Sequence, residues 1–192
     1  MLEKVRRDSE RYRRLGGWYT NAGFWIGLTY RLGAWAREQP APLRVFFGAL
    51  ARIIGIPWRW LFNVGLPSSA KIGGGLCLIH PRNILVSHQI EIGEDCLIFH
   101  EVTLGTGPVP GTPRIGDRVD LFVGARILGG VTIGNDVQVG ANCVVTRDVP
   151  DGGVVMTAAP RIIPRELIER LPNGRDARRA RAMEEDRSED PA

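Results

Sequence analysis

The chain has few cysteines and no long uninterrupted apolar run. Its three cysteines make neither an even set nor a CxxC pair, which favours a reducing compartment over a disulfide framework. The charged N-terminus "MLEKVRRDSERYRR" lacks the apolar region of a secretory signal. The longest apolar stretch, residues 45–66, is broken by Arg52, Pro57 and Arg59, which argues against a membrane span. We therefore expect a cytoplasmic protein.

Positive charge is concentrated at the N-terminus. Residues 1–66 carry 11 Lys and Arg against 4 Asp and Glu, whereas residues 67–163 carry 7 against 9. The basic segment also contains the tryptophan-rich run "IIGIPWRWLF". Two interpretations stay open: a segment that lies on the inner, anionic membrane face or meets an acidic partner, and an ordinary solvated helical face packed on the rest of the protein.

A six-residue repeat dominates the second half of the chain. From Ile115 the sequence divides into IGDRVD, LFVGAR, ILGGVT, IGNDVQ, VGANCV and VTRDVP, and each hexad opens with an aliphatic residue and has a small or apolar residue at position five. Upstream, the same frame gives IGGGLC, LIHPRN, an eight-residue ILVSHQIE, IGEDCL and IFHEVT. Such a short fixed period predicts a solenoid of parallel strands, with positions one and five facing inward.

All three histidines fall within this repeat. His80 and His100 both occupy position three, and 20 residues separate their hexads: three hexads plus two extra residues, which we place near Gln89 to Glu91. If that insertion bulges outward, the two histidines lie on one face in adjacent coils, about 4.8 Å apart. His88 would then occupy the inward position five, where a structural role is expected.

Small apolar residues continue the histidine column. Position three of later hexads holds Val123 and Ala141, so a reactive end beside a slot for a long ligand is one interpretation, and two exposed strand histidines is the other. A Gly/Pro-rich loop interrupts the frame between Leu104 and Ile115 and favours the first, because regular coils place ligand contacts on such loops.

Taken together, these motifs resemble the serine O-acetyltransferase branch of the hexapeptide-repeat acyltransferases, including its relatives that modify polysaccharides. The likeness covers roughly residues 66–163, through "AKIGGGLCLIHPRNILVS", "VTLGTG", "VGARILGGVTIG", "VGANCVVTRDVP" and "AAPRII". It implies a mainly β fold, a left-handed parallel β-helix preceded by α-helices. The implied organisation is a helical segment at 1–65, a β-helix at 66–163 and a polar, disordered tail at 164–192.

The same resemblance implies the site. His80 matches the catalytic base; apart from the resemblance, the position of His100 one coil further on suggests that it holds the acceptor or the thioester. Acetyl-CoA is implied as the co-substrate, with no permanently bound cofactor, no metal and no nucleic-acid partner. The positions implied to contact acetyl-CoA are Thr106, Gly107, Val123, Gly124, Ala141 and Arg161. Homotrimers, or multiples of them, with sites between subunits are also implied.

The chain departs from this family where serine acetyltransferases carry two carboxylates and a second histidine, because Gly65, Ile79 and Thr112 occupy those positions. A buried anion would be needed to bind the ammonium group of serine, so the sequence favours a sugar hydroxyl as acceptor, with serine as the alternative. What orients His80 stays open between a backbone carbonyl, Glu101 and a neighbouring subunit.

The predicted mechanism is direct acyl transfer. His80 removes the proton of the acceptor hydroxyl as the oxygen attacks the thioester carbonyl, and amides of Gly105 to Gly107 stabilise the oxyanion. Cys96 and Cys143 fall at inward position five and are expected to be structural. Two other classes stay open: a zinc hydratase of the carbonic anhydrase type, which needs three converging histidines, and a non-catalytic solenoid scaffold.

Overall fold

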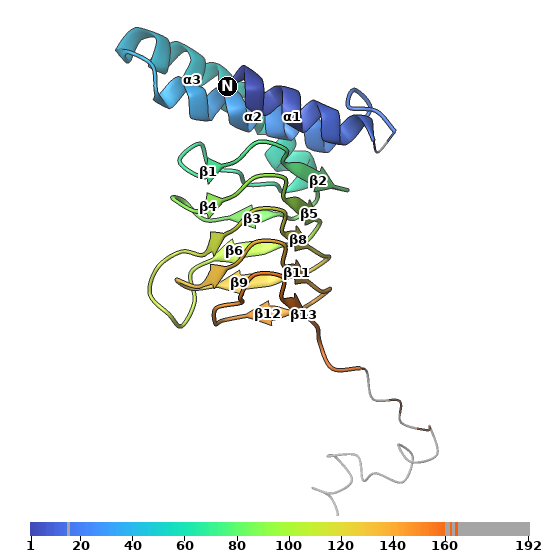
Figure 1. Ribbon diagram of the computed structural model, residues 1–192. Coiled ribbons are helices and arrows are strands. Elements are labelled where there is room, and N and C mark those ends of the chain that lie inside the picture. The colour runs from blue at the N-terminus through green and yellow to red at the C-terminus, as the bar shows by residue number, and fades with distance from the viewer. Residues whose placement is uncertain (15, 160–161, 163, 165–192) are drawn as a thin grey trace, which may run out of the picture. The chain divides into compact units, whose positions relative to one another are not determined.

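A computed structural model describes residues 1–14, 16–159, 162 and 164. Three helices come first: α1 (Leu2–Arg13), α2 (Ala22–Arg37) and α3 (Ala41–Phe62). Asn21 caps α2, since its side chain accepts a hydrogen bond from the amide of Gly23. Asn63 ends α3 in the left-handed conformation. The helices lie across one end of a column of short strands (Figure 1).

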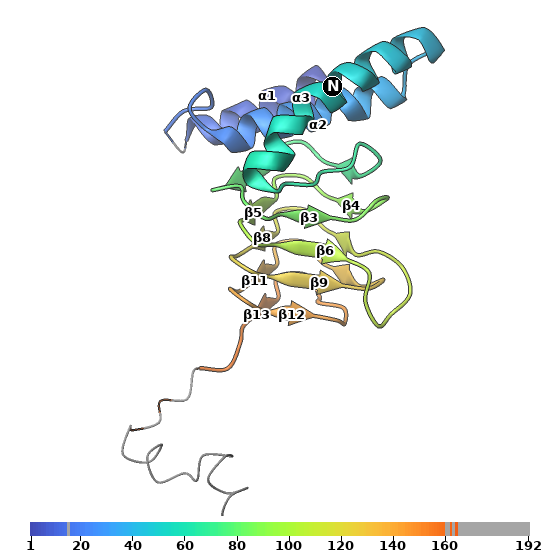
Figure 2. The same ribbon diagram turned by 180° about the vertical axis from the view of Figure 1, so that it is seen from behind.

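The strands form three parallel sheets, the faces of a triangular coil. Face 1 holds β1 (Lys71–Ile72), β4 (Glu91–Ile92), β7 (Arg114–Ile115) and β10 (Thr132–Ile133). Face 2 holds β2 (Cys77–Ile79), β5 (Leu97–Phe99), β8 (Asp120–Leu121), β11 (Gln138–Val139) and β13 (Val154–Val155). Face 3 holds β3 (Leu85–Val86), β6 (Thr103–Gly105), β9 (Arg126–Leu128) and β12 (Val144–Val145). The predicted solenoid is confirmed (Figure 2).

The core follows the hexad frame. Positions one and five from Ile115 onward are buried, and Val149, which is partly buried, packs against the same core. The described residues 67–155 thus hide one aliphatic column inside the coil, and that column supplies the main hydrophobic stabilisation. Cys96 and Cys143 lie inside it, as the frame predicts.

The predicted position of the two-residue insertion is wrong. Cys77 pairs with Leu97, 20 residues on, whereas Leu85 pairs with Thr103, 18 residues on. The two extra residues therefore lie between β2 and β3, directly after His80, and not near Gln89. The eight-residue repeat is LIHPRNIL, and VSHQIE is an ordinary hexad in which His88 takes position three. His88 is exposed, so its predicted inward placement is wrong too.

The helices seal the first coil with polar side chains. The hydroxyl of Tyr30 donates to the carbonyl of Ala70 (2.7 Å) and accepts from the amide of Ile72 (3.2 Å). The hydroxyl of Tyr12 accepts from the amide of Leu78 at 2.7 Å. These contacts satisfy backbone groups that an uncovered first coil would leave unpaired.

A buried ion pair belongs to the same seal. Arg31 Nε donates to Asp8 Oδ2 at 3.0 Å, and the two side chains are only 3% and 6% exposed. Arg31 also donates to the carbonyl of Ile72 (2.7 Å), and Asp8 accepts from the amide of Leu76 (2.8 Å). We call the set Asp8, Tyr12, Tyr30 and Arg31 the helical cap.

The third helix is unusual in its exposure. Among the described residues, α3 is the one helix long and apolar enough to cross a membrane by length and composition, and Pro57 does not interrupt it. Ala51 is its one buried residue. The inner side of α3 packs on α2, where the rings of Trp35 and Phe47 meet edge to face at 5.2 Å.

Candidate active site

His80 lies at the corner between faces 2 and 3, in the turn created by the insertion. Its backbone is left-handed (φ 48°), as is that of Asn83 (φ 55°), and its side chain is exposed. The same left-handed conformation recurs at other corners of the coil, at Asp95, Glu101 and Asp136 for example, so it marks a tight corner turn. The end of α3 fixes the turn: the amide of Asn83 donates to the carbonyl of Phe62 (2.8 Å), and Asn63 Nδ2 donates to Asn83 Oδ1 (2.6 Å).

His100 lies at the same corner one coil further on. Ile79 pairs with Phe99, so His80 and His100 each directly follow one of two paired strands. His100 is half-buried, and its Nδ1 is buried without a hydrogen-bond partner among the described residues. An unpaired buried nitrogen costs about 1–3 kcal/mol, so the structure holds this ring in place at a cost. We call His80, His100 and the adjacent Glu101 the histidine corner.

The predicted apolar wall continues from this corner. The amide of Gly124 donates to the carbonyl of His100 (3.1 Å), and that of Asn142 to the carbonyl of Val123 (2.8 Å), so the coils stack in register. Val123 is half-buried and Ala141 is exposed. A Cβ on Gly124 would lie 2.2 Å from Asn142 Oδ1, and its φ of 69° also requires glycine.

The interrupting loop, residues 106–113, leaves from the opposite edge of face 3. It joins β6 to β7, whereas the histidine corner precedes β6 (Figure 1). Thr106 and Gly107 are exposed there. A cleft of about 390 Å³ lies beside this loop, lined by Gln89, Glu91, Pro110, Gly111, Thr112, Arg114, Gly130, Val131 and Thr132.

The structure separates two of the predicted groups. Within one chain, Gly105 to Gly107 lie at the far end of strand β6 from the histidine corner. The predicted wall and histidines gather at one corner, and the predicted loop residues Thr106 and Gly107 at another. Arg161, the remaining predicted contact, lies outside the described residues.

His88 does not join the other two histidines. It lies at the corner between faces 3 and 1, and its Nδ1 is 3.1 Å from Ser69 Oγ. No group of three or more His, Cys, Asp or Glu side chains suited to a metal ion occurs in the described part of the chain.

Cys77 and Cys96 are poor nucleophiles. Burial raises the pKa of the Cys77 and Cys96 thiols to about 11, so little reactive thiolate forms at neutral pH. Cys96 Sγ also donates to the carbonyl of Gly116 at 3.2 Å. Cys77, whose place the hexads left unspecified, packs with Tyr12 and Phe24 beneath the helices.

The family's usual carboxylate positions hold no carboxylate. Gly65 bridges to Leu85 at the edge of face 3, and Ile79 packs beside Cys77. Glu101, exposed next to His100, supplies a carboxylate at the histidine corner. Sequence reasoning missed Asn63 and Asn83, which hold the His80 turn; asparagine in a Pro-containing turn was the one available signal.

A triangular coil of six-residue repeats, with two histidines at one corner and a small apolar wall below them, defines a hexapeptide-repeat acyltransferase. No family model matches the chain. Two curated relatives are serine acetyltransferases. That of Helicobacter pylori J99 is 37% identical over 72% of this chain and 80% of its own length. That of Mycobacterium tuberculosis is 36% identical over 70% of this chain and 57% of its own length.

Solved structures agree with this comparison. A serine acetyltransferase in complex with CoA superposes with a TM-score of 0.68 at 27% identity, covering 80% of this chain and 65% of that one. The Neisseria gonorrhoeae serine acetyltransferase in complex with serine gives 0.64 at 25% identity, covering 82% and 66%. The chain thus spans about two thirds of these solved chains.

The chain belongs to the serine acetyltransferase family. Its fold is the left-handed parallel β-helix of that family, as predicted. It is an acyl-CoA-dependent O-acyltransferase with acetyl-CoA as co-substrate, which confirms the predicted enzyme class.

Proposed function

We propose that this enzyme transfers the acetyl group of acetyl-CoA to the hydroxyl of L-serine. The observation that carries the proposal is the exposed His80 at the corner of a coil whose relatives are serine acetyltransferases. His80 removes the hydroxyl proton as the serine oxygen attacks the thioester carbonyl. The C–S bond breaks, CoA leaves as the thiol after protonation, and O-acetylserine forms.

His100 and Glu101 complete the acceptor site in this proposal. The ring of His100 is half-buried, and its accessible edge can hydrogen-bond the acceptor. Glu101 is the carboxylate that can meet the serine ammonium group, in place of the carboxylates absent at Gly65 and Ile79. The wall of Val123, Gly124 and Ala141 lines the CoA groove.

The active unit is a homotrimer with each site between two chains. The histidine corner and the loop carrying Thr106 lie at opposite edges of face 3, so the corner of one chain and the loop of its neighbour can form one groove. The amides of Gly105 to Gly107 then reach the oxyanion from the neighbouring chain.

Subunit complementation tests this arrangement. His80→Ala and Thr106→Glu chains, each inactive alone, should regain activity when coexpressed, because about a quarter of the sites in random trimers pair an intact corner with an intact loop. Sedimentation of the wild-type chain should give the trimer mass. No recovery from coexpressed chains, or a monomer at micromolar concentration, would contradict the shared site.

The acceptor is tested by CoA release from acetyl-CoA with serine, homoserine and nucleotide sugars in parallel. Serine-dependent release, with O-acetylserine identified by mass spectrometry, is the expected result. The sugar acceptor favoured by the sequence depends on Gly65, Ile79 and Thr112 alone, and the reported relatives do not support it. Turnover with a nucleotide sugar and none with serine would instead support the sugar acceptor. No CoA release with any acceptor would favour the non-catalytic solenoid scaffold.

A further inference from the structure

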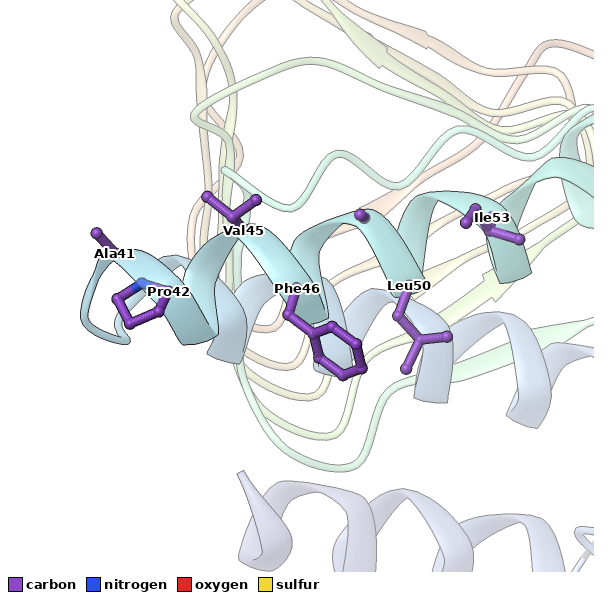
Figure 3. A pocket seen from close by; sticks show the side chains of 7 residues that line it. Ala41, Pro42, Val45, Phe46, Leu50 and Ile53 are labelled. Carbon is purple, nitrogen blue, oxygen red and sulfur yellow. The ribbon is translucent and has the colours of Figure 1, made fainter.

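The outer side of α3 is a large apolar surface that no described part of the chain covers. Its exposed members include Val45 (69%), Phe46 (64%), Ile53 (64%), Trp60 (85%) and Leu61 (69%). Figure 3 shows Val45, Phe46, Leu50 and Ile53 projecting from the helix where they line a shallow apolar groove of about 720 Å³. We call this surface the α3 face. Soluble monomers rarely expose so continuous an apolar patch.

The charges of α3 are all positive and lie in one stripe. Arg44, Arg52 and Arg59 are exposed, and residues 41–62 contain no Asp or Glu. At about 100° per residue the three arginines fall within about 80° of one another, along one flank of the α3 face. A wide apolar face bordered by arginines and carrying an exposed Trp60 is the pattern of a helix that lies in a membrane interface.

We propose that α3 docks, parallel to the surface, into the headgroup region of a bilayer that contains anionic lipids. The apolar side chains enter the acyl boundary, and the arginines pair with lipid phosphates. A second copy of the chain fits less well, because its α3 would bring three more arginines and no carboxylate.

A membrane-spanning α3 fits less well too. The opposite side of the helix packs on α2, where Trp58 Nε1 donates to Thr29 Oγ1 at 3.2 Å, and spanning would break that packing. Arg52, near the middle of the helix, would also enter the bilayer centre, where a guanidinium is strongly unfavourable. A helix lying in the surface keeps both the α2 contact and the solvated arginines.

Vesicle flotation of the full chain tests the proposal. The chain should float with phosphatidylcholine vesicles containing phosphatidylglycerol and not with phosphatidylcholine alone, and raised salt should weaken binding. Ile53→Glu should reduce partitioning ~10-fold or more, because it replaces an apolar side chain that inserts with a charge that anionic lipids repel. Leu2→Glu, at a 77% exposed position on α1, makes the same charge change and should leave binding intact.

A triple Arg44→Gln, Arg52→Gln, Arg59→Gln variant should lose the preference for anionic vesicles. CoA release should be unchanged in all variants, which shows that they are folded. The proposal is overturned if neither vesicle floats the chain, or if Ile53→Glu and Leu2→Glu behave alike. It is also overturned if Ile53→Glu instead halves the mass of a larger assembly without vesicles, or if bound chain resists alkaline carbonate as a spanning protein does.

Discussion

The helical cap and the histidine corner handle polar groups in opposite ways. At the cap, Asp8 and Arg31 are almost fully buried, and their hydrogen bonds go to each other and to the first coil. At the corner, His80 is exposed on a left-handed backbone, and Nδ1 of His100 has no partner within the described chain. Paired polar groups at the cap hold the fold together, whereas the groups at the corner are those that the proposed mechanism uses. Substitutions should therefore affect stability at the cap and turnover at the corner.

The largest effect is expected from Asp8→Ala, which leaves the Arg31 guanidinium buried without its counter-ion. The free energy of unfolding should fall by about 3–5 kcal/mol, measured by chemical denaturation at fixed chain concentration. Glu10→Ala is the control, because Glu10 pairs with Arg6 in solvent, at 48% and 62% exposure, and should cost under about 1 kcal/mol. Equal losses in the two variants would remove the distinction between cap and surface.

His80→Ala should leave the unfolding midpoint and CoA binding unchanged and lower kcat ~100-fold or more, the scale of general-base catalysis. Steady-state CoA release and calorimetric CoA titration measure the two quantities. His100→Ala, the neighbouring control, should lower kcat less. A greater loss of kcat in His100→Ala than in His80→Ala would mean that His100, and not His80, is the base.

Tyr30→Phe removes a hydroxyl that serves both Ala70 and Ile72 at the first coil. Because it leaves two buried backbone groups unpaired, we expect a stability loss of about 1–3 kcal/mol with unchanged kcat. Tyr19→Phe is the matched control, since Tyr19 is 67% exposed and should be neutral. A fall in kcat with unchanged stability would mean that the cap also takes part in catalysis.

The smallest effect is expected from His88→Ala. Its side chain is exposed, and Ser69 is its one hydrogen-bond partner within the described part of the chain, so stability should change by less than about 0.5 kcal/mol and kcat by less than about twofold. Thermal denaturation and CoA release measure both. Loss of turnover together with a bound metal ion would instead support the zinc hydratase.

The sequence predicts the coil well because its signal is local and repeated. Every hexad from Ile115 onward places an aliphatic or small residue inward at positions one and five. A wrong frame would put polar residues inside every coil, so the correct frame is easy to recognise. The sequence misplaces the insertion because Ile84, Leu85 and Val86 are consecutive apolar residues, and either Ile84 or Val86 can open a hexad. The turn residues Pro81 and Asn83 mark the true position.

The cap and the divided site were beyond sequence reasoning for a different reason. Tyr12 meets Leu78 across 66 residues, and Asp8 meets Leu76 across 68, and no spacing rule links such pairs. The loop at Thr106 follows soon after His100 in the chain, yet strand β6 carries it to another corner. The loop and His100 are therefore close in the sequence but lie at different corners of the coil.

The sealed first coil also limits how chains can join lengthwise. Strand columns of this kind could stack end to end, each last coil templating the next molecule's first coil, and grow into filaments. Filament growth requires both ends of every molecule to accept a neighbour. Here the tyrosine hydroxyls and the Asp8–Arg31 pair already occupy the backbone groups at one end. Lengthwise association through the strands can therefore join at most two columns, through the last coil of each, which the helical cap does not cover.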